Sequence, residues 1–357
     1  MSTQPGGGPQ HVHALATRIA TRGFAPVIAG PRDGALFDAF TSARLEIVEA
    51  RTDRLRASTL ARLAALVRAR GIRLIHSHGK GAGVYGRLVA RAARIPAVHT
   101  FHGIHFERYP APARAAYFAL ERRLSRWTRT VINVSRVQES EGLALRLFTA
   151  AQSRVVPNGV DGEALAEGAM DRSAARLKLG LSPDARVIGC AARLDPVKRL
   201  DLLLHAVAAV PNVEAVVIGR GPEGERLRTL SRALGLGARV RLSGEIPDAW
   251  RLYRAFDVYV SASSKEGMPV AVLEAMALGL PVVVTDIPAH REVLGPEAET
   301  LAEATPEALA TMLRSVLDDA DRRARLGAGN RERVRREFGI ASMVDAVERI
   351  YRDAVRV

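Results

Sequence analysis

The sequence predicts an α/β protein made of two Rossmann-like domains with parallel sheets. Short apolar, β-rich segments alternate with amphipathic helical runs along all 357 residues, a length that suits two domains. The alternation is broken once, at "VVPNGVDGEAL" (residues 155–165), where Pro-Asn-Gly predicts a turn. Because repeated strand–helix units favour parallel sheets covered by helices on both faces, we expect domains at residues 1–160 and 161–339.

The strands are predicted from short runs of β-branched and apolar residues, and the helices from apolar residues at helical spacing. In the first half the strand segments are "FAPVIAG" (24–30), "LEIVEA" (45–50), "IRLIHSH" (72–78), "PAVHTFH" (96–102) and "TVINVS" (130–135). In the second half they are "ARVIGCAA" (185–192), "VEAVVIG" (213–219), "RVRLSG" (239–244), "DVYVSAS" (257–263) and "PVVVTD" (281–286). Typical helical segments between them are "TLARLAALVRAR" (59–70) and "LDLLLHAVAAV" (200–210).

Composition is that of a soluble globular protein, with 48% hydrophobic and 25% charged residues. No apolar run reaches the ~18 residues of a membrane-spanning helix. The first ten residues, "MSTQPGGGPQ", lack the basic and apolar regions of a signal peptide. The single cysteine, Cys190, lies in an apolar strand, so we expect a buried, inert thiol and a cytoplasmic protein without disulfides.

The net charge of +14 is unevenly distributed. Residues 1–160 carry 24 lysines and arginines against 9 aspartates and glutamates, a net of +15, whereas residues 161–357 carry 28 against 29. Nucleic acid, an anionic membrane surface or a phosphorylated substrate could bind such a positive half.

Ligands of parallel sheets bind in the loops at the carboxyl ends of the strands. After "VEAVVIG", Gly219, Gly221 and Gly224 could bring backbone N–H groups close to an anion at a helix N-terminus, or they could simply be turn residues. After "ARVIGCAA", Arg193 and Lys198 could clamp a diphosphate, or they could be solvated surface charges.

The stretch "SSKEGMPVAVLEAMALGLPVVV" (263–284) decides between these alternatives. It predicts a loop containing Glu266 at a strand end and a helix that ends at Gly279. Glu274 lies about one turn into that helix among apolar neighbours, where a carboxylate needs a partner. The free N–H groups near Met268 to Val270 should face the same crevice. Carboxylates for hydroxyl groups, and cations and N–H donors for phosphates, together predict a sugar nucleotide as ligand.

The Glu266-x7-Glu274 spacing in "EGMPVAVLEAMALGLPVVVTD" resembles the signature of glycosyltransferase family 4, retaining enzymes of the GT-B fold. The resemblance covers nearly the whole chain, because further motifs follow in the family's order. They are "GGG" (6–8), "HSHGKGAGVYGRLVARAARIPAVHTFHG" (76–103), "VPNGVD" (156–161), "ARLDPVKRLDLLL" (192–204) and "VIGRGPEGERL" (217–227). The second of these looks most like members that build capsular, exopolysaccharide or O-antigen repeats.

The family's GT-B fold implies an acceptor-binding domain at 1–160 and a nucleotide-sugar-binding domain at 161–339, facing each other across an interdomain cleft. The segment 340–357 resembles the family's final helix, which crosses back to the first domain. One departure is clear: the family begins with an apolar strand before the Gly-Gly loop, and only "MSTQP" precedes Gly6 here. We therefore expect a first sheet without its leading strand.

The resemblance also implies roles for matching residues. Glu274 would bind the donor's ribose, Glu266 would face the transferred sugar, and the segment 242–246 would lie beside the base. The implied catalytic residues are His102, Glu266, Arg193 and Lys198. The implied donor-binding residues are Gly7, Gly8, Gly219, Gly221, Glu223, Gly267, Met268, Val270 and Glu274. On the acceptor side, the implied residues are His78 and Lys80.

Cleavage of a sugar–phosphate bond builds positive charge on the sugar and negative charge on the leaving diphosphate, which Arg193 and Lys198 would oppose. No carboxylate is an obvious nucleophile, and the family precedent is front-face displacement with retention. No Asp-x-Asp motif flanks the site, so we expect no metal and no cofactor beyond the substrate nucleotide sugar. An alternative is that the histidines of "HSHG" and "HTFHGIH" bind zinc.

The segment after His102, "GIHFERYPAPARAAYFALERRLSRWTRT", combines aromatic residues with six arginines, and with Arg136 just beyond it seven arginines lie from Arg108 to Arg136. A basic amphipathic helix here would suit an anionic membrane and an undecaprenyl-diphosphate-linked acceptor, on the cytoplasmic face of the plasma membrane. The alternative is a helix that packs its apolar face on the first domain. No nucleic-acid recognition motif is present.

The predicted function is thus a hexosyltransferase (EC 2.4) that moves a sugar from a UDP- or GDP-sugar to an acceptor in cell-surface polysaccharide biosynthesis. Two alternatives remain open at this level. One is another GT-B enzyme, such as a sugar-nucleotide epimerase. The other is a degenerate, non-catalytic nucleotide-sugar-binding protein.

Overall fold

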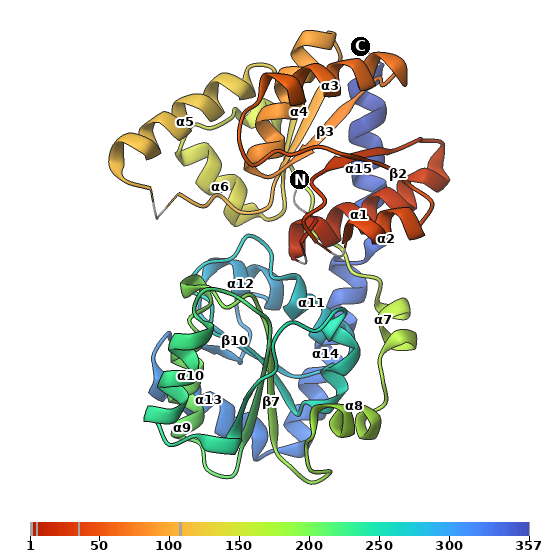
Figure 1. Cartoon of the computed structure of the whole chain (residues 1–357). Coiled ribbons are helices and arrows are strands. Elements are labelled where there is room, and N and C mark those ends of the chain that lie inside the picture. Colours follow the sequence, from red (N-terminus) through yellow and green to blue (C-terminus); the bar gives the residue numbers. More distant parts are fainter. Residues whose placement is uncertain (1–2, 5, 35, 107–108, 357) are drawn as a thin grey trace. The chain divides into compact units, whose positions relative to one another are not determined.

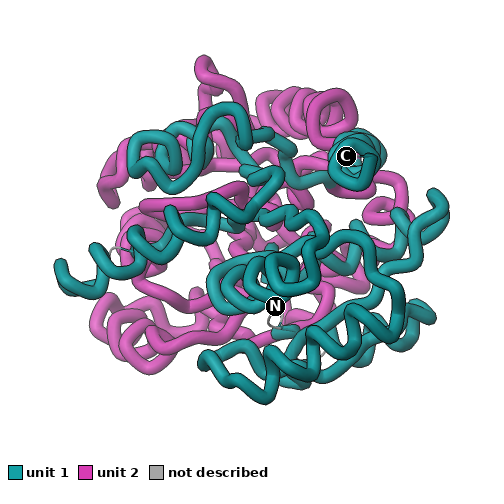
Figure 2. Tube along the Cα trace, turned by 90° about the horizontal axis from the view of Figure 1, so that it is seen from above, with its two compact units in different colours: residues 1–159, 340–357 teal, residues 160–339 magenta. Residues whose placement is uncertain are grey.

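The computed structural model describes residues 3–4, 6–34, 36–106 and 109–356, and the chain divides into two compact units (Figure 2). Unit 1 combines residues 1–159 with 340–357, and unit 2 consists of residues 160–339. The expected boundary after residue 160 differs from this division by one residue. The segment 340–357 groups with unit 1, as the resemblance implied.

Unit 2 contains a six-stranded sheet in the order β12-β11-β10-β7-β8-β9, in which every pair is parallel. The sequence predicted five of the six strands, each to within a few residues, and missed the two-residue β12. The strands are β7 (Val187–Ala191), β8 (Glu214–Ile218), β9 (Val240–Leu242), β10 (Val258–Ser261), β11 (Val282–Thr285) and β12 (Leu301–Ala302). Because β7 and β10 are neighbours, their two carboxyl-end loops, which carry the predicted site residues, lie at one edge of the sheet.

Helices cover both faces of this sheet, with α9, α10 and α13 packed together on one side and α7, α11 and α14 on the other (Figure 1). No helix in the described parts of the chain is both long and apolar enough to cross a bilayer. The helices are α7 (Gly162–Gly168), α8 (Arg172–Leu179), α9 (Leu200–Ala208), α10 (Gly224–Ala233), α11 (Val270–Ala277), α12 (Pro288–Leu294), α13 (Pro306–Leu317) and α14 (Ala320–Glu337). Single 3-10 turns are η3 (Pro196–Lys198), η4 (Gly237–Arg239) and η5 (Ala249–Ala255).

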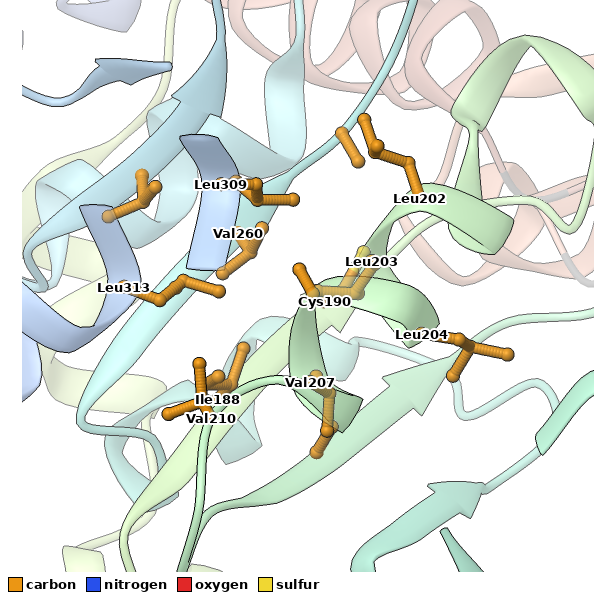
Figure 3. Close-up of a cluster of buried hydrophobic side chains, with 14 of the residues drawn as sticks. Ile188, Cys190, Leu202, Leu203, Leu204, Val207, Val210, Val260, Leu309 and Leu313 are labelled. Atoms are coloured by element: carbon orange, nitrogen blue, oxygen red, sulfur yellow. The ribbon is translucent and has the colours of Figure 1, made fainter. Parts of the chain in front are cut away.

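A large hydrophobic core of unit 2 forms where α9 and α13 meet β7, β8 and β10 (Figure 3). Ile188 and Cys190 of β7 point into it beside Leu203 and Val207 of α9 and Leu313 of α13. Burial raises the pKa of the Cys190 thiol to about 12, so the thiol stays protonated and unreactive, as predicted.

Unit 1 contains two separate parallel sheets, one of two strands and one of four in the order β3-β4-β5-β6. The strands are β1 (Val27–Gly30), β2 (Glu46–Glu49), β3 (Ile75–His78), β4 (Ala97–Phe101), β5 (Thr130–Asn133) and β6 (Ser153–Val155). The helices are α1 (Gly7–Ile19), α2 (Leu36–Ser42), α3 (Ala57–Ala69), α4 (Lys80–Ala93), α5 (Ala111–Ser125), α6 (Arg136–Ala144) and α15 (Ile340–Val355), with 3-10 turns η1 (Ala20–Arg22) and η2 (Ala150–Gln152).

Helix α1 connects the two sheets of unit 1. Among the described residues no strand precedes it, and Thr3 instead hydrogen-bonds to Pro31 and Asp33 in the loop after β1. Leu15 of α1 packs in a cluster with β4, β5 and α15, whereas Val12 packs with α2 and residues of both β1 and β2. Side chains from two apolar faces of α1 therefore pack against both sheets of unit 1.

Helix α15 packs against the four-stranded sheet of unit 1. Its Val344, Val347 and Tyr351 share a core with Val98 of β4, and the Tyr351 hydroxyl lies 2.6 Å from Nδ1 of His76 in β3. The far C-terminal segment is thus part of the hydrophobic core of unit 1.

Candidate active site

Lys198 and Glu266, both predicted catalytic residues, are directly paired in unit 2. Lys198 Nζ lies 2.6 Å from Glu266 Oε1, which also accepts a 2.6 Å hydrogen bond from Ser263 Oγ. Lys198 ends η3 after β7, and Glu266 lies in the loop after β10, so the adjacency of these strands brings the two residues together. Burial alone would raise the pKa of Glu266, but the Lys198 charge and the bonds from Lys198 and Ser263 outweigh it and lower the pKa. Glu266 is therefore a carboxylate at neutral pH.

Arg193, the second predicted diphosphate ligand, is largely exposed and forms an ion pair with Asp195 two residues later. Its side chain is 72% exposed, against 23% for Lys198. Lys198 is thus held in one position, whereas Arg193 keeps enough freedom to turn toward an anionic ligand. The structure therefore brings Lys198 to Glu266 but pairs Arg193 with a different carboxylate.

Glu274 lies in α11, and its only recorded hydrogen bond in the described structure comes from the Tyr253 hydroxyl at 3.5 Å. Burial raises the pKa of Glu274 to about 8; the Tyr253 bond lowers it, and the nearby charge of Asp248 raises it further. A partly buried carboxyl with one long hydrogen bond is well suited to accept bonds from ligand hydroxyl groups. Sequence reasoning did not identify Tyr253, which η5 supplies.

The raised pKa of Glu274 makes stability depend on pH. A carboxyl whose pKa is higher in the folded state than its ordinary ~4.3 holds its proton more tightly when folded, so stability is lost as pH rises from about 4.5 to 8. Glu274→Gln removes this loss, and we expect it to stabilise the ligand-free protein by roughly 2–4 kcal/mol at pH 8.5 but not at pH 4.5.

Thermal unfolding of wild type and Glu274→Gln across that pH range measures the effect. Glu225→Gln, at an exposed glutamate of α10, is the matched control and should show no such pH dependence. A difference between wild type and Glu274→Gln that stays constant with pH would contradict the assignment.

The loop before α11 offers backbone donors beside Glu266. Helix α11 begins at Val270 after Pro269, with no side-chain cap. The N–H groups of Val270 and Ala271 have no hydrogen-bond partner recorded in the described structure, as expected for a first helical turn. Gly267 and Met268 are buried and hold this loop against the protein. The predicted donors near residues 267–270 therefore share one loop with Glu266.

Gly219 and Gly221 are required by a close approach of two strand-end loops. A Cβ on Gly219, whose φ is +150°, would lie 1.9 Å from the Ala192 carbonyl oxygen, and one on Gly221 would lie 2.5 Å from that of Leu194. The Gly219 N–H donates to Gly244, so it is used within the protein. These glycines let the loop approach the segment that carries Arg193. The Glu223 N–H donates to the Leu194 carbonyl, and the Glu223 carboxylate pairs with Arg226.

Three residues that support Glu266 were missed by sequence reasoning: Ser263, Thr285 and His290. Thr285 Oγ1 donates to the Ser263 carbonyl at 2.6 Å, and His290 Nδ1 donates to the Thr285 carbonyl at 2.6 Å. This leaves His290 Nε2 to accept from Ser261 Oγ at 3.2 Å. Thr285 ends β11 and Ser263 lies two residues after the neighbouring β10, so their positions at strand ends were a usable signal.

In unit 1, the predicted His78 and His102 lie side by side, at the end of β3 and just after β4. His78 Nδ1 is 3.1 Å from His102 Nε2, and the two rings stack. A Cβ on Gly8, in the first turn of α1, would lie 3.3 Å from the His102 ring, so Gly8 packs directly on it. The Gly-Gly segment, His78 and His102 are thus one local site, joined by His11 of α1, which sequence reasoning missed.

Lys80, predicted beside His78, turns away from the histidine pair. Its ammonium group contacts the His105 carbonyl, lies 3.0 Å from the Tyr109 hydroxyl, and sits over the rings of Tyr109 and Tyr117. Lys80 thereby fastens the N-terminus of α4 to the segment that leads into α5.

Comparison with known proteins follows this division of the chain. Residues 5–164 match the family model described as Glycosyltransferase Family 4, and residues 171–333 match Glycosyl transferases group 1. D-inositol 3-phosphate glycosyltransferase of Kineococcus radiotolerans is 30% identical over 315 residues, which cover 79% of this chain and 72% of that protein. The lipopolysaccharide core biosynthesis mannosyltransferase LpsB of Rhizobium meliloti is 30% identical over 255 residues, which cover 67% and 71%.

Solved structures show the same fold at lower identity. Anabaena Alr3699/HepE, in complex with UDP and glucose, matches with a TM-score of 0.87 and 21% identity over 99% of this chain and 98% of that one. WaaG, a glycosyltransferase involved in lipopolysaccharide biosynthesis, matches with a TM-score of 0.76 and 16% identity over 98% and 97%.

The parallel sheets in two units and these likenesses define a GT-B glycosyltransferase, as the sequence predicted. The chain belongs to the glycosyltransferase family represented by the family 4 and group 1 models, and it is a transferase.

Proposed function

We propose that the protein is a retaining hexosyltransferase that uses a UDP- or GDP-sugar and a lipid-linked saccharide acceptor in the biosynthesis of cell-surface polysaccharide. The names of its relatives support this assignment: LpsB of Rhizobium meliloti is a lipopolysaccharide core mannosyltransferase, and EpsD of Bacillus subtilis is a putative glycosyltransferase. Alr3699/HepE has been crystallised with UDP-glucose, which supports a nucleotide-sugar donor.

The observation that carries the proposal is the arrangement of Lys198, Glu266 and Glu274 in unit 2. Glu266 is an ionised carboxylate in contact with a cation, and Glu274 is a nearly unpaired carboxyl beside Tyr253. A nucleotide sugar needs both kinds of group, because it carries hydroxyls on its ribose and sugar and negative charge on its diphosphate. Glu274 would accept from the ribose hydroxyls and Glu266 from those of the transferred sugar.

As the sugar–phosphate bond breaks, Lys198 would remain beside Glu266 and donate to the departing diphosphate, with Arg193 released from Asp195 to assist. The Val270 and Ala271 N–H groups add two further donors for an anion. His102 would hydrogen-bond to the transferred sugar, since burial keeps its imidazole neutral by lowering its pKa well below the usual value. These cations supply the charge that a divalent metal supplies in other transferases, so transfer should continue in the presence of a chelator.

The basic face of α5 supports a membrane-associated acceptor. Its arginines are exposed, as are Leu120 of the helix and Tyr109 just before it, at 43% and 37%. The opposite face packs inward through Leu124. The exposed arginines of this segment are Arg114, Arg122, Arg123, Arg126 and Arg129. A peripheral position on an anionic, cytoplasmic membrane surface would place such residues against lipid phosphates.

Donor turnover by Glu274→Ala and His102→Ala tests the proposal. A panel of UDP- and GDP-sugars is screened first by thermal shift, and the stabilising donor is then incubated with and without undecaprenyl-diphosphate-linked acceptor. Glu274→Ala should weaken nucleotide binding about 2- to 10-fold, since the loss of one hydrogen bond costs ~0.5–1.5 kcal/mol. His102→Ala should lower turnover while nucleotide binding is retained.

Glu225→Ala is the matched control for Glu274→Ala. Binding of nucleotide without turnover, with any acceptor, would identify a non-catalytic binding protein instead. Epimerised donor in the absence of acceptor would identify the other GT-B class, and unchanged behaviour of both variants would exclude this site.

A further inference from the structure

Unit 1 holds a cluster of four buried or partly buried histidines that come from three segments of the chain. His11 lies in α1, His76 and His78 lie in β3, and His102 follows β4. The rings of His11 and His102 are 4.9 Å apart, and those of His11 and His78 are 5.7 Å apart. His11, His78 and His102 each present one ring nitrogen, and these three atoms all lie within 4.8 Å of one another.

Hydrogen bonds separate the histidines that are available as ligands from the one that is not. Both ring nitrogens of His76 are engaged, by the Tyr351 hydroxyl at 2.6 Å and by Thr100 Oγ1 at 2.7 Å. His11 uses only Nδ1, which lies 2.9 Å from the carbonyl oxygen of the Asn158 side chain and must donate to it. His11 Nε2 is buried and has no partner among the described residues, although a buried lone pair normally has one.

We propose that His11, His78 and His102 form a binding site for a first-row transition-metal ion of the Zn²⁺ class. Imidazole nitrogens bind zinc at ~2.0–2.1 Å, which places tetrahedral ligand atoms roughly 3.4 Å apart. The 3.1 Å between His78 Nδ1 and His102 Nε2 is already close to this value, and the His11 nitrogen, which lies within 4.8 Å of both, must move closer. Three histidines leave a fourth position for water or a ligand.

The protonation state of the cluster suits a metal. Burial lowers the pKa of His11 to about 4 and those of His78 and His102 well below the usual value. The three rings are therefore neutral at pH 7, and none has to lose a proton before it binds a metal ion. The bond between His78 and His102 needs one ring N–H, and that proton moves to the other nitrogen of its own ring when both facing lone pairs bind the ion. Asn158 then holds the His11 tautomer that presents Nε2.

The site has a functional consequence that rests on the function proposed above. A metal ion would occupy His102, the residue assigned to the transferred sugar, while Glu274 and Lys198 belong to unit 2 and remain free for nucleotide. Zinc should therefore inhibit transfer and leave nucleotide binding unchanged.

Titration of the full chain with Co²⁺, read by its visible absorption, and with Zn²⁺, read by calorimetry, tests the site with the metal alone. We expect one ion per chain. His78→Ala should abolish stoichiometric binding, and Asn158→Ala should weaken it about 10–100-fold, the usual effect of removing a residue that orients a ligand. His11→Gln keeps the polarity of the side chain without a common zinc ligand and should also lose the ion. His205→Ala, at an exposed histidine of α9, is the matched control and should bind as wild type does.

Circular dichroism verifies that each variant is folded. If His78→Ala does not fold, His11→Gln tests the site in its place. Binding that survives both His11→Gln and His78→Ala, or that is absent in the wild type, would overturn the site. Because no sugar is present, these results do not depend on the proposed reaction. Zinc that binds but leaves turnover unchanged would overturn the inhibition, and unchanged turnover in His102→Ala would instead overturn the role of His102 in transfer.

Discussion

Lys198→Ala is expected to lower kcat by about 100- to 1000-fold, because the removal of one donor to a developing negative charge typically costs this much. Lys198 is the partly buried cation of unit 2 that touches a predicted site carboxylate, at 2.6 Å from Glu266. Arg193, the other predicted diphosphate ligand, is mostly exposed and paired with Asp195, so it cannot replace the charge of Lys198 without rearrangement. Steady-state kinetics with saturating donor measures the change, and the KM for donor should change less than kcat.

The substitution also exposes how Glu266 is kept ionised. Without Lys198, burial acts on Glu266 with only the Ser263 bond and the nearby His290 to oppose it, so the pKa of Glu266 should rise. The acidic limb of the pH–rate profile should then move to higher pH, which a purely structural lysine would not cause. Lys178→Ala, at an exposed lysine of α8, is the matched control. A decrease in kcat no larger than in Lys178→Ala would contradict the role of Lys198.

The sequence was most informative in unit 2, where strands buried on both faces appear as unbroken apolar runs. The runs before Arg193 and before Glu266 become β7 and β10, which lie next to each other. Sequence reasoning assigned Lys198 to phosphate and Glu266 to sugar, but it did not predict their ion pair. That contact depends on strand order, which brings together residues 68 positions apart.

Unit 1 was predicted less completely, because its arrangement depends on tertiary packing. The resemblance implied a first sheet without its leading strand, but nothing in the sequence indicated that α1 would pack between two sheets. His11 looked like any polar residue of an amphipathic helix, and only the fold brings it to His78 and His102. Strand β6, of three residues, is too short for a periodic pattern, as is the two-residue β12 of unit 2.

Arg87 is a charged residue whose burial the sequence did not indicate. In "GRLVARAARI" it resembles a solvated arginine of a helix, like Arg91 four residues later. In the structure its side chain is 0% exposed and pairs with Glu121 of α5, which is 1% exposed, at 2.8 Å. Arg87 Nε also donates to the Gly83 carbonyl at 2.8 Å. Burial of a charge is costly, so this pair is stable only while both partners are present.

Arg87→Ala is accordingly expected to destabilise unit 1 by about 3–5 kcal/mol, since it leaves the Glu121 carboxylate buried without its cation. For a unit of this size, that loss corresponds to a decrease in Tm of ~10 °C. Glu121→Ala should cost a similar amount, because it leaves the Arg87 guanidinium alone. Thermal or urea unfolding, followed by a probe of unit 1 such as Trp127, measures both.

The double variant Arg87→Met/Glu121→Leu separates the pair from the packing around it. Because apolar residues of similar volume can replace a buried ion pair at little cost, the double variant should be closer to wild type than either single alanine variant. Arg91→Ala, on the exposed face of α4, is the matched control and should change stability by less than ~0.5 kcal/mol. If the two alanine effects simply added in the Arg87→Ala/Glu121→Ala protein, the residues would not be coupled. If the double alanine variant instead loses less stability than the sum of the two single variants, Arg87 and Glu121 are coupled. In that case their ion pair holds the basic helix α5 to α4 within unit 1.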